Sequence, residues 1–199
     1  MLHAVDSTEG RRSFLVRGVK RGNAVAVFHP LSILDAVSSA SPKSTLSHLR
    51  EWEPAVPLHS VRSDLVKSSL AMFVSEVLYR SLTSELADPQ LFDWLCETIA
   101  ELDAAEGSVA NYPLWFLVSY TVRMGFMPGE RIEPGGIFQP EEAALFQRVL
   151  HSTFAETMAI PLSGTRRQAF ARKMLQYLSW HLGATIEAKS LDVLHEVLT

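Results

Sequence analysis

The sequence predicts an α+β fold, in which a small antiparallel sheet or partial barrel precedes an all-helical bundle. Residues before about position 60 favour strands and turns, and the apolar residues after it follow helical spacing. The net charge also changes sign between the two parts. We therefore divide the chain into a basic β module, residues 1–57, and an acidic helical domain, residues 58–199.

The β module is predicted from β-branched and aromatic residues separated by turn signals. Gly18, Gly22 and Asn23 separate the first two apolar segments, and Ser41 and Pro42 separate the last two. The predicted strands are Ser13–Val19, Asn23–Leu31, Ile33–Ser39 and Ser44–Trp52.

Helical spacing begins after Pro54 and Pro57, two residues that discourage helix. In the segment 63–84 the apolar positions cover nearly the whole helical circumference, so this helix should lie at the centre of a bundle. Later helices are predicted from their ends, such as Asp88 followed by Pro89 at a start and Gly183 at a stop. They span about 88–107, 108–124, 140 onward, 163–183 and 190–198.

The composition indicates a globular protein of the reduced cytosol. The chain has 199 residues, of which 47% are hydrophobic and 20% charged. The single cysteine, Cys96, excludes an intramolecular disulfide and a cysteine zinc cage. No apolar signal core opens the sequence, and the apolar runs are shorter than the roughly 20 residues of a membrane span.

Motifs of catalysis are missing from the sequence. It contains no G-x-S-x-G elbow, no P-loop and no G-x-G-x-x-G turn, and its seven histidines lack the spacing of a helical zinc site. We expect a protein that is not an enzyme and has no cofactor, no metal, no small-molecule substrate and no membrane partner.

Positive charge is concentrated near the start of this acidic chain. Residues 1–62 hold eight Lys and Arg against five Asp and Glu, whereas residues 63–199 hold ten against seventeen. Five of the cations lie within the eleven residues 11–21. A concentrated positive field of this kind is typical of a site for a polyanion.

Two interpretations of this cluster remain open. Charged residues often protect a sheet edge from aggregation, and the cluster could be such a solvated face. Alternatively, its cations contact phosphates while aromatics such as Phe14 and Phe28 stack on bases. The residues predicted to bind DNA are Arg11, Arg12, Phe14, Arg17, Lys20 and Arg21.

A second cationic group lies on the helix predicted near 163–183. Arg166 and Lys173 are about two turns apart and can share a face beside Phe170. The group is either a charged outer face of the bundle or a docking site for an acidic, hydrophobic peptide. The partner-binding candidates here are Arg166, Arg167, Phe170 and Lys173.

Seven stretches together resemble the RecO family of recombination mediators, especially its Bacteroidetes-type members. They occur in the family's order across nearly the whole chain. The stretches are GRRSFLVRG (10–18), FHPLSIL (28–34), PLHSVRSDLVKSSLAMFVSEVLYRSL (57–82), LFDWL (91–95), ANYPLWFLV (110–118), MGFMP (124–128) and KSLDVLHEVL (189–198).

The resemblance implies an N-terminal OB-fold followed by a helical domain, in a non-enzymatic cytoplasmic protein that works at the nucleoid. Such proteins bind single-stranded and duplex DNA and anneal complementary strands. They contact RecR and the acidic C-terminal tail of single-strand-binding protein, and they assist recombinase loading. Lys189 opens a stretch that matches the family, and we add it to the partner-binding candidates.

The chain departs from the family pattern in two places. Family members begin with a further segment that forms the first OB strand, so we expect either that the start codon was assigned late or that the barrel is incomplete. The four-cysteine zinc module of some relatives is excluded by the lone Cys96. If the shortened barrel no longer binds nucleic acid, the alternative is a protein-interaction scaffold whose helical domain carries the function.

Overall fold

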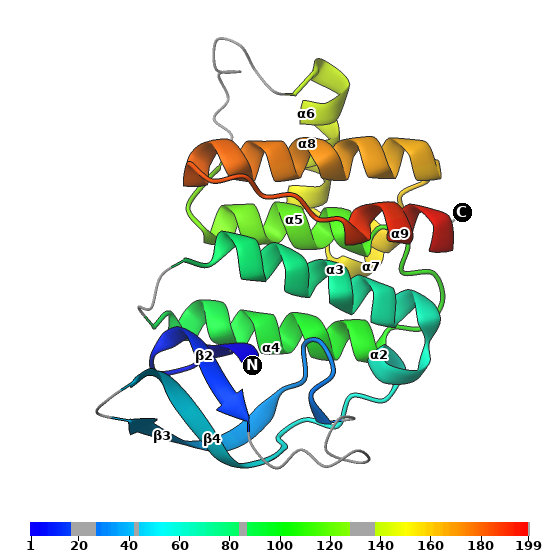
Figure 1. The fold of residues 1–199 in the computed structure, drawn as a ribbon. Helices are drawn as coiled ribbons and strands as arrows, with labels where there is room; N and C mark the ends of the chain where they lie inside the picture. The colour runs from blue at the N-terminus through cyan, green and yellow to red at the C-terminus, as the bar shows by residue number, and fades with distance from the viewer. Residues whose placement is uncertain (17–26, 42–43, 84–86, 128–137, 199) are drawn as a thin grey trace.

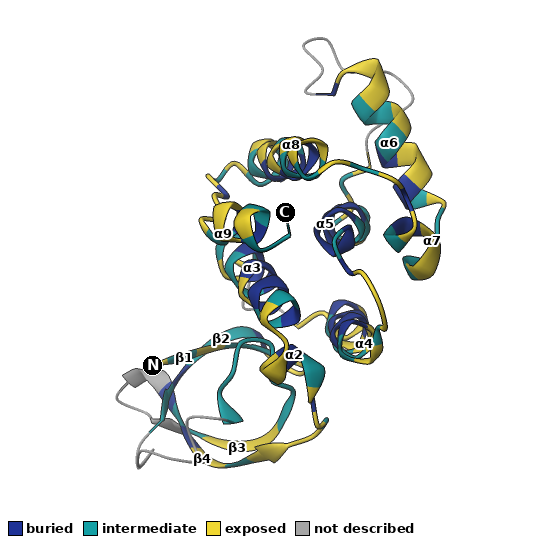
Figure 2. Cartoon of the chain, turned by 90° about the vertical axis from the view of Figure 1, so that its right-hand side faces the viewer, coloured by how far each residue is buried: buried dark blue, intermediate teal, exposed yellow. Residues whose placement is uncertain are grey.

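A computed structural model describes residues 1–16, 27–41, 44–83, 87–127 and 138–198. A curved sheet lies on one side of a helical bundle, next to α2, α3 and α4 (Figures 1 and 2). This arrangement confirms the predicted α+β class. The last strand ends at Pro54 and the next helix begins at Ser60. That residues 1–57 and 58–199 are separate domains stays a prediction.

The sheet has four strands among the described residues, and it is mixed rather than purely antiparallel. Its order is β1-β2-β4-β3, in which β1 with β2 and β3 with β4 are antiparallel pairs. The central pair, β2 with β4, is parallel, and Phe14 lies opposite Ser47. The strands are β1 (Leu2–Asp6), β2 (Gly10–Val16), β3 (Leu34–Ser41) and β4 (Ser44–Pro54).

One predicted strand is wrong in its described part, and one observed strand was not predicted. Val27 is helical and residues 28–31 form a turn, in which the amide of Ser32 donates to the carbonyl of His29 at 3.0 Å. Within this turn Leu31 has a φ of 63°, where glycine is usual. Its side chain packs against the apolar core of the bundle. The unpredicted strand is β1.

The helices follow the predicted order, and the central position of α3 is confirmed. Leu70, Phe73 and Val77 of α3 are completely buried. The helix α5 begins later than predicted, and the short helices α2 and α7 were missed. The elements are α2 (Ser60–Ser63), α3 (Leu65–Ser81), α4 (Pro89–Ala104), α5 (Tyr112–Arg123), α6 (Pro140–Leu150), α7 (Phe154–Met158), α8 (Gly164–Leu182) and α9 (Ser190–Val197).

The predicted helix ends have the expected physical causes. The Asp88 side chain accepts a hydrogen bond from the amide of Leu91 and so caps the start of α4. Gly183 ends α8 with a φ of 62°, a left-handed conformation that costs glycine little. Both signals act within a few residues of the helix ends that they mark.

Polar contacts tie the segment after the sheet to α4. The carboxylate of Asp103 accepts hydrogen bonds from the amides of His59, at 3.1 Å, and Val61, at 2.7 Å. The buried Lys67 donates from Nζ to the carbonyls of Asp103 and Ala105, at 2.8 and 2.7 Å. These bonds satisfy groups at helix ends that have no partner within their own helices.

Two further properties concern the described residues alone. Every helix among them is too short or too polar to cross a membrane. In the same ranges, no three His, Cys, Asp or Glu residues form a group that could hold a metal ion.

Candidate nucleic-acid interface

The strand β2 places the first two cations of the basic cluster on opposite faces of the sheet. Successive side chains of a strand alternate between faces, so Arg11 and Arg12 point in different directions. The structure therefore does not bring them together on one surface. The other predicted cations, Arg17, Lys20 and Arg21, lie outside the described residues.

Arg11 contacts the helical bundle. Its Nη1 donates to the carbonyl of Leu82 at 2.6 Å, and its guanidinium lies 4.7 Å from the ring centre of Tyr79. The ring of His3 lies on the same tyrosine, 4.9 Å between centres. The Leu82 carbonyl is at the negative end of α3, where a cation is favourable. Arg11 thus joins the sheet to α3.

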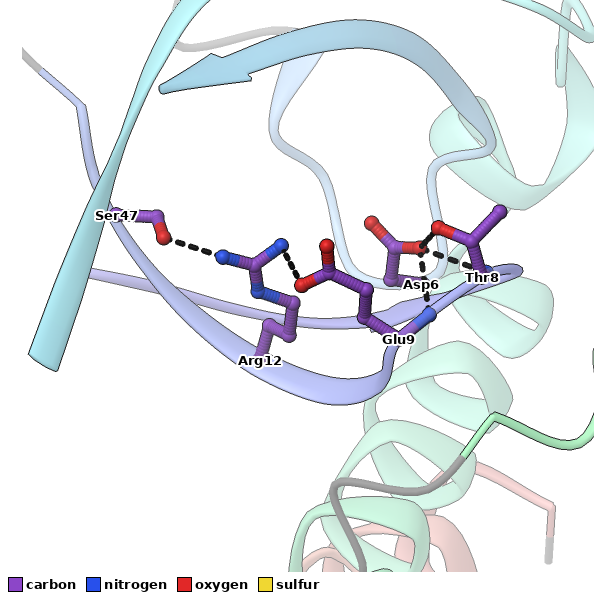
Figure 3. A network of polar contacts seen from close by, with 5 residues as sticks. All are labelled: Asp6, Thr8, Glu9, Arg12 and Ser47. Atoms are coloured by element: carbon purple, nitrogen blue, oxygen red, sulfur yellow. Dashed lines mark hydrogen bonds and ion pairs between the residues drawn. The ribbon is translucent and has the colours of Figure 1, made fainter. Parts of the chain in front are cut away.

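Arg12 has protein partners on the other face of β2 (Figure 3). Its guanidinium forms an ion pair with Glu9 and a hydrogen bond with the hydroxyl of Ser47 on β4. It also lies over the ring of Phe14, 5.2 Å from the ring centre. The Arg12 side chain is only 18% exposed. These contacts fix the guanidinium in one position at the β2–β4 pair.

The structure corrects the predicted role of Phe14 in the interface. Its side chain is 4% exposed, so its ring is not available for a base to stack on. The physical reason is strand alternation, which puts Phe14 on the same face as Arg12 and opposite the buried Ser47. The ring supports the guanidinium of Arg12 instead.

The turn between β1 and β2 was not singled out by sequence reasoning. The Oδ1 of Asp6 accepts hydrogen bonds from the amide and the hydroxyl of Thr8, at 2.8 and 2.7 Å, and from the amide of Glu9, at 3.1 Å. Burial raises the pKa of Asp6, but these hydrogen bonds outweigh burial and hold it below its ordinary value. An Asp two residues before Thr is the signal that could have found this turn.

Two further features of the sheet could contact nucleic acid. Arg50 on β4 is exposed, and its Nε donates to the Ser39 hydroxyl at 2.8 Å. The rings of Phe28 and Trp52 pack together at 5.2 Å and are partly exposed. Sequence reasoning missed Arg50 and Trp52 because both lie far along the chain from the basic cluster.

The second cationic group is divided between the surface and the core. Arg166 is exposed and lies 3.4 Å from Glu141, whereas Arg167 donates to the carbonyls of Leu162, at 2.8 Å, and Leu198, at 3.2 Å. Phe170 is 2% exposed, so it is wrong as a surface contact. Helical periodicity turns Phe170 into the core between its cationic neighbours.

Lys173 and Lys189 occupy different environments. Lys173 is partly buried on α8, and Lys189 is exposed immediately before α9. Next to Lys189, the amide and the hydroxyl of Ser190 donate to Glu76 on α3, at 3.0 and 2.7 Å. This stretch of the family pattern therefore fastens α9 to α3.

A small apolar pocket lies beside Arg167, where α5, α8 and α9 meet. Gln168 and His195 also reach it. Its apolar lining comes mainly from Pro113, Leu114, Ala171, Leu191, Leu194 and Leu198. The arrangement combines a hydrophobic surface with a neighbouring cation.

The fold and this interface define an α+β protein with a cationic strand placed against a helical bundle. Residues 62–130 match the family model described as "Recombination protein O C terminal". The chain is 30% identical to the DNA repair protein RecO of Flavobacterium psychrophilum, over 96% of this chain and 89% of that protein. It is 29% identical to the protein of the same name from Phocaeicola vulgatus, over 96% and 88% respectively. The chain belongs to the RecO family.

Proposed function

We propose that this chain acts in DNA repair and recombination as a non-enzymatic mediator. It binds single-stranded and duplex DNA, anneals complementary strands and assists recombinase loading, in the cytoplasm at the nucleoid. The observation that carries the proposal is the 30% identity to a DNA repair protein RecO over 96% of the chain. The basic cluster that begins on β2 supplies the positive charge that DNA binding requires.

The DNA contacts in this proposal come from the basic cluster that begins on β2 and from two partly exposed aromatic rings. The cations that neutralise phosphates are Arg12, Arg17, Lys20 and Arg21. Arg11 is left out of this set because its guanidinium already donates to the carbonyl of Leu82. The partly exposed rings of Phe28 and Trp52 replace Phe14 as stacking candidates.

The partner contacts come from the helical domain. We assign to it RecR and the acidic tail of single-strand-binding protein, two partners that the family resemblance implies. We assign the tail to the apolar surface beside Arg167, because a peptide of mixed acidic and apolar character needs a hydrophobic surface next to a cation. In this assignment Arg166 and Lys173 add charge outside the pocket, and Lys189 does so at α9.

The DNA part of the proposal is tested by fluorescence anisotropy of a labelled single-stranded oligonucleotide titrated with the chain. Binding should weaken steeply as salt rises, because each phosphate contact releases counterions. Replacing Arg17, Lys20 and Arg21 by Glu should lower the affinity at least about tenfold. Unchanged affinity in that variant would contradict the assignment of DNA to the basic cluster.

A second candidate function is a protein-interaction scaffold without DNA binding. The observation in its favour is that both described cations of β2 already have protein acceptors, namely Leu82 for Arg11 and Glu9 for Arg12. Absence of DNA binding at low salt, together with saturable binding of a short acidic peptide ending in phenylalanine, would favour this scaffold.

A further inference from the structure

An acidic side chain already lies on the guanidinium that the proposed function assigns to DNA. Glu9 forms an ion pair with Arg12, and the two side chains differ in exposure, 58% for Glu9 and 18% for Arg12 (Figure 3). The carboxylate thus lies on the solvent side of the pair. A phosphate that binds Arg12 therefore has to share the guanidinium with Glu9 or displace it.

The position of Glu9 is set by an ordered turn. Its amide donates to Asp6 Oδ1, which also holds Thr8 by two hydrogen bonds. Gly10 follows with a φ of 73°, which lets the chain reverse direction into β2. The turn therefore presents the carboxylate to Arg12 in a defined geometry.

We propose that Glu9 occupies the place of a DNA phosphate on Arg12 and lowers the DNA affinity of the sheet. This inference rests on the proposed function. Carboxylate and phosphate oxygens accept the same charge-assisted hydrogen bonds from a guanidinium. An ion pair with a largely exposed partner is weak and screened by salt, so a phosphate can displace Glu9.

The remaining contacts of Arg12 would keep its guanidinium in place during this exchange. Ser47 accepts from Nη2, and Phe14 lies beneath the guanidinium. Neither group is negatively charged, so neither competes with phosphate. Glu9 is thus the removable partner of an otherwise fixed cation.

The test is single-stranded DNA binding by Glu9→Gln, measured by anisotropy at low salt. The variant should bind about two- to fivefold more tightly than the natural chain, the range expected for release of one exposed ion pair. Glu51→Gln is the matched control. It removes the same charge from an exposed position on β4. Among the described residues, Glu51 forms no ion pair.

A second pair of variants separates the effect of the Glu9–Arg12 contact from the general electrostatic effect of removing a negative charge. In an Arg12→Ala background, Glu9→Gln should leave DNA affinity unchanged, because no guanidinium remains to be released. Thermal unfolding of each variant shows whether the fold keeps its stability.

The outcomes distinguish this inference from the function on which it rests. If the natural chain binds DNA and Glu9→Gln gains no more than Glu51→Gln, the inference alone is wrong. A gain that persists without Arg12 would also overturn it. Absence of DNA binding in every variant, Glu9→Gln included, would contradict both.

Discussion

The helical bundle completely buries Phe73, Phe116 and Leu117, whereas the sheet buries only Phe14 and Leu49 among its described apolar side chains. Figure 2 shows the same contrast, with dark-blue residues concentrated in the helices. The sheet instead relies on polar contacts such as Arg12 with Glu9 and Ser47, and on docking to α3 through Arg11. Arg11 and Arg12 are therefore structural, and only Arg12 of the two is also a candidate for DNA binding.

The largest effect is expected in the bundle core. Phe73→Ala should lower the free energy of unfolding by about 3–5 kcal/mol, because it leaves a cavity among buried neighbours. Phe14→Ala should cost less, since the more open sheet can collapse around the gap. Urea unfolding measures both, and Val37→Ala at an exposed sheet position is the control. Equal losses for Phe73→Ala and Phe14→Ala would break the contrast between the two regions.

A smaller effect is expected where the sheet meets the bundle. Arg11→Ala should cost about 1–3 kcal/mol, because it removes a charged hydrogen bond to Leu82 and the contact with Tyr79. Arg50→Ala, at an exposed position on the same sheet, should change the free energy of unfolding by no more than about 0.5 kcal/mol. If the two variants have equal stability in urea, Arg11 does not join the two regions.

The smallest effect concerns pH. Burial raises the pKa of Glu76, but hydrogen bonds from Ser190 and the Lys189 amide outweigh burial and lower it below 4.5. A lowered folded-state pKa stabilises the protein above the unfolded-state pKa. That stability is lost as the pH falls through the folded-state value.

Glu76→Gln should therefore lose stability at pH 7 and show a flatter decline in acid than the natural chain. Thermal unfolding between pH 7 and the acid range measures this. Parallel curves for the two proteins would mean that Glu76 does not fasten α9 to α3.

Local signals in the sequence were sufficient to predict most helices of the helical domain. The Asp88 cap, the Gly183 stop and the apolar spacing of α3 act over a few residues, so they can be read from the chain directly. The parallel pairing of β2 with β4 could not be predicted in this way, because it joins residues more than thirty positions apart. The α7 helix is too short for a periodic pattern.

The candidate site was harder to predict than the fold. A run of cations predicts a positive surface, but strand alternation sends Arg11 to the bundle and Arg12 to Glu9. Aromatic residues next to cations can equally be core, as Phe14 and Phe170 are. Pairings such as Arg12 with Ser47 depend on strand register, which neither segment specifies alone.

The most direct test of the account compares two charge reversals of equal size. One variant carries Arg17→Glu, Lys20→Glu and Arg21→Glu in the β module, and the other carries Arg166→Glu, Arg172→Glu and Lys173→Glu on α8. Both are titrated with a labelled single-stranded oligonucleotide at low salt. We predict at least about a tenfold loss of affinity for the first variant and little change for the second. Equal losses, or a loss confined to the α8 variant, would contradict it.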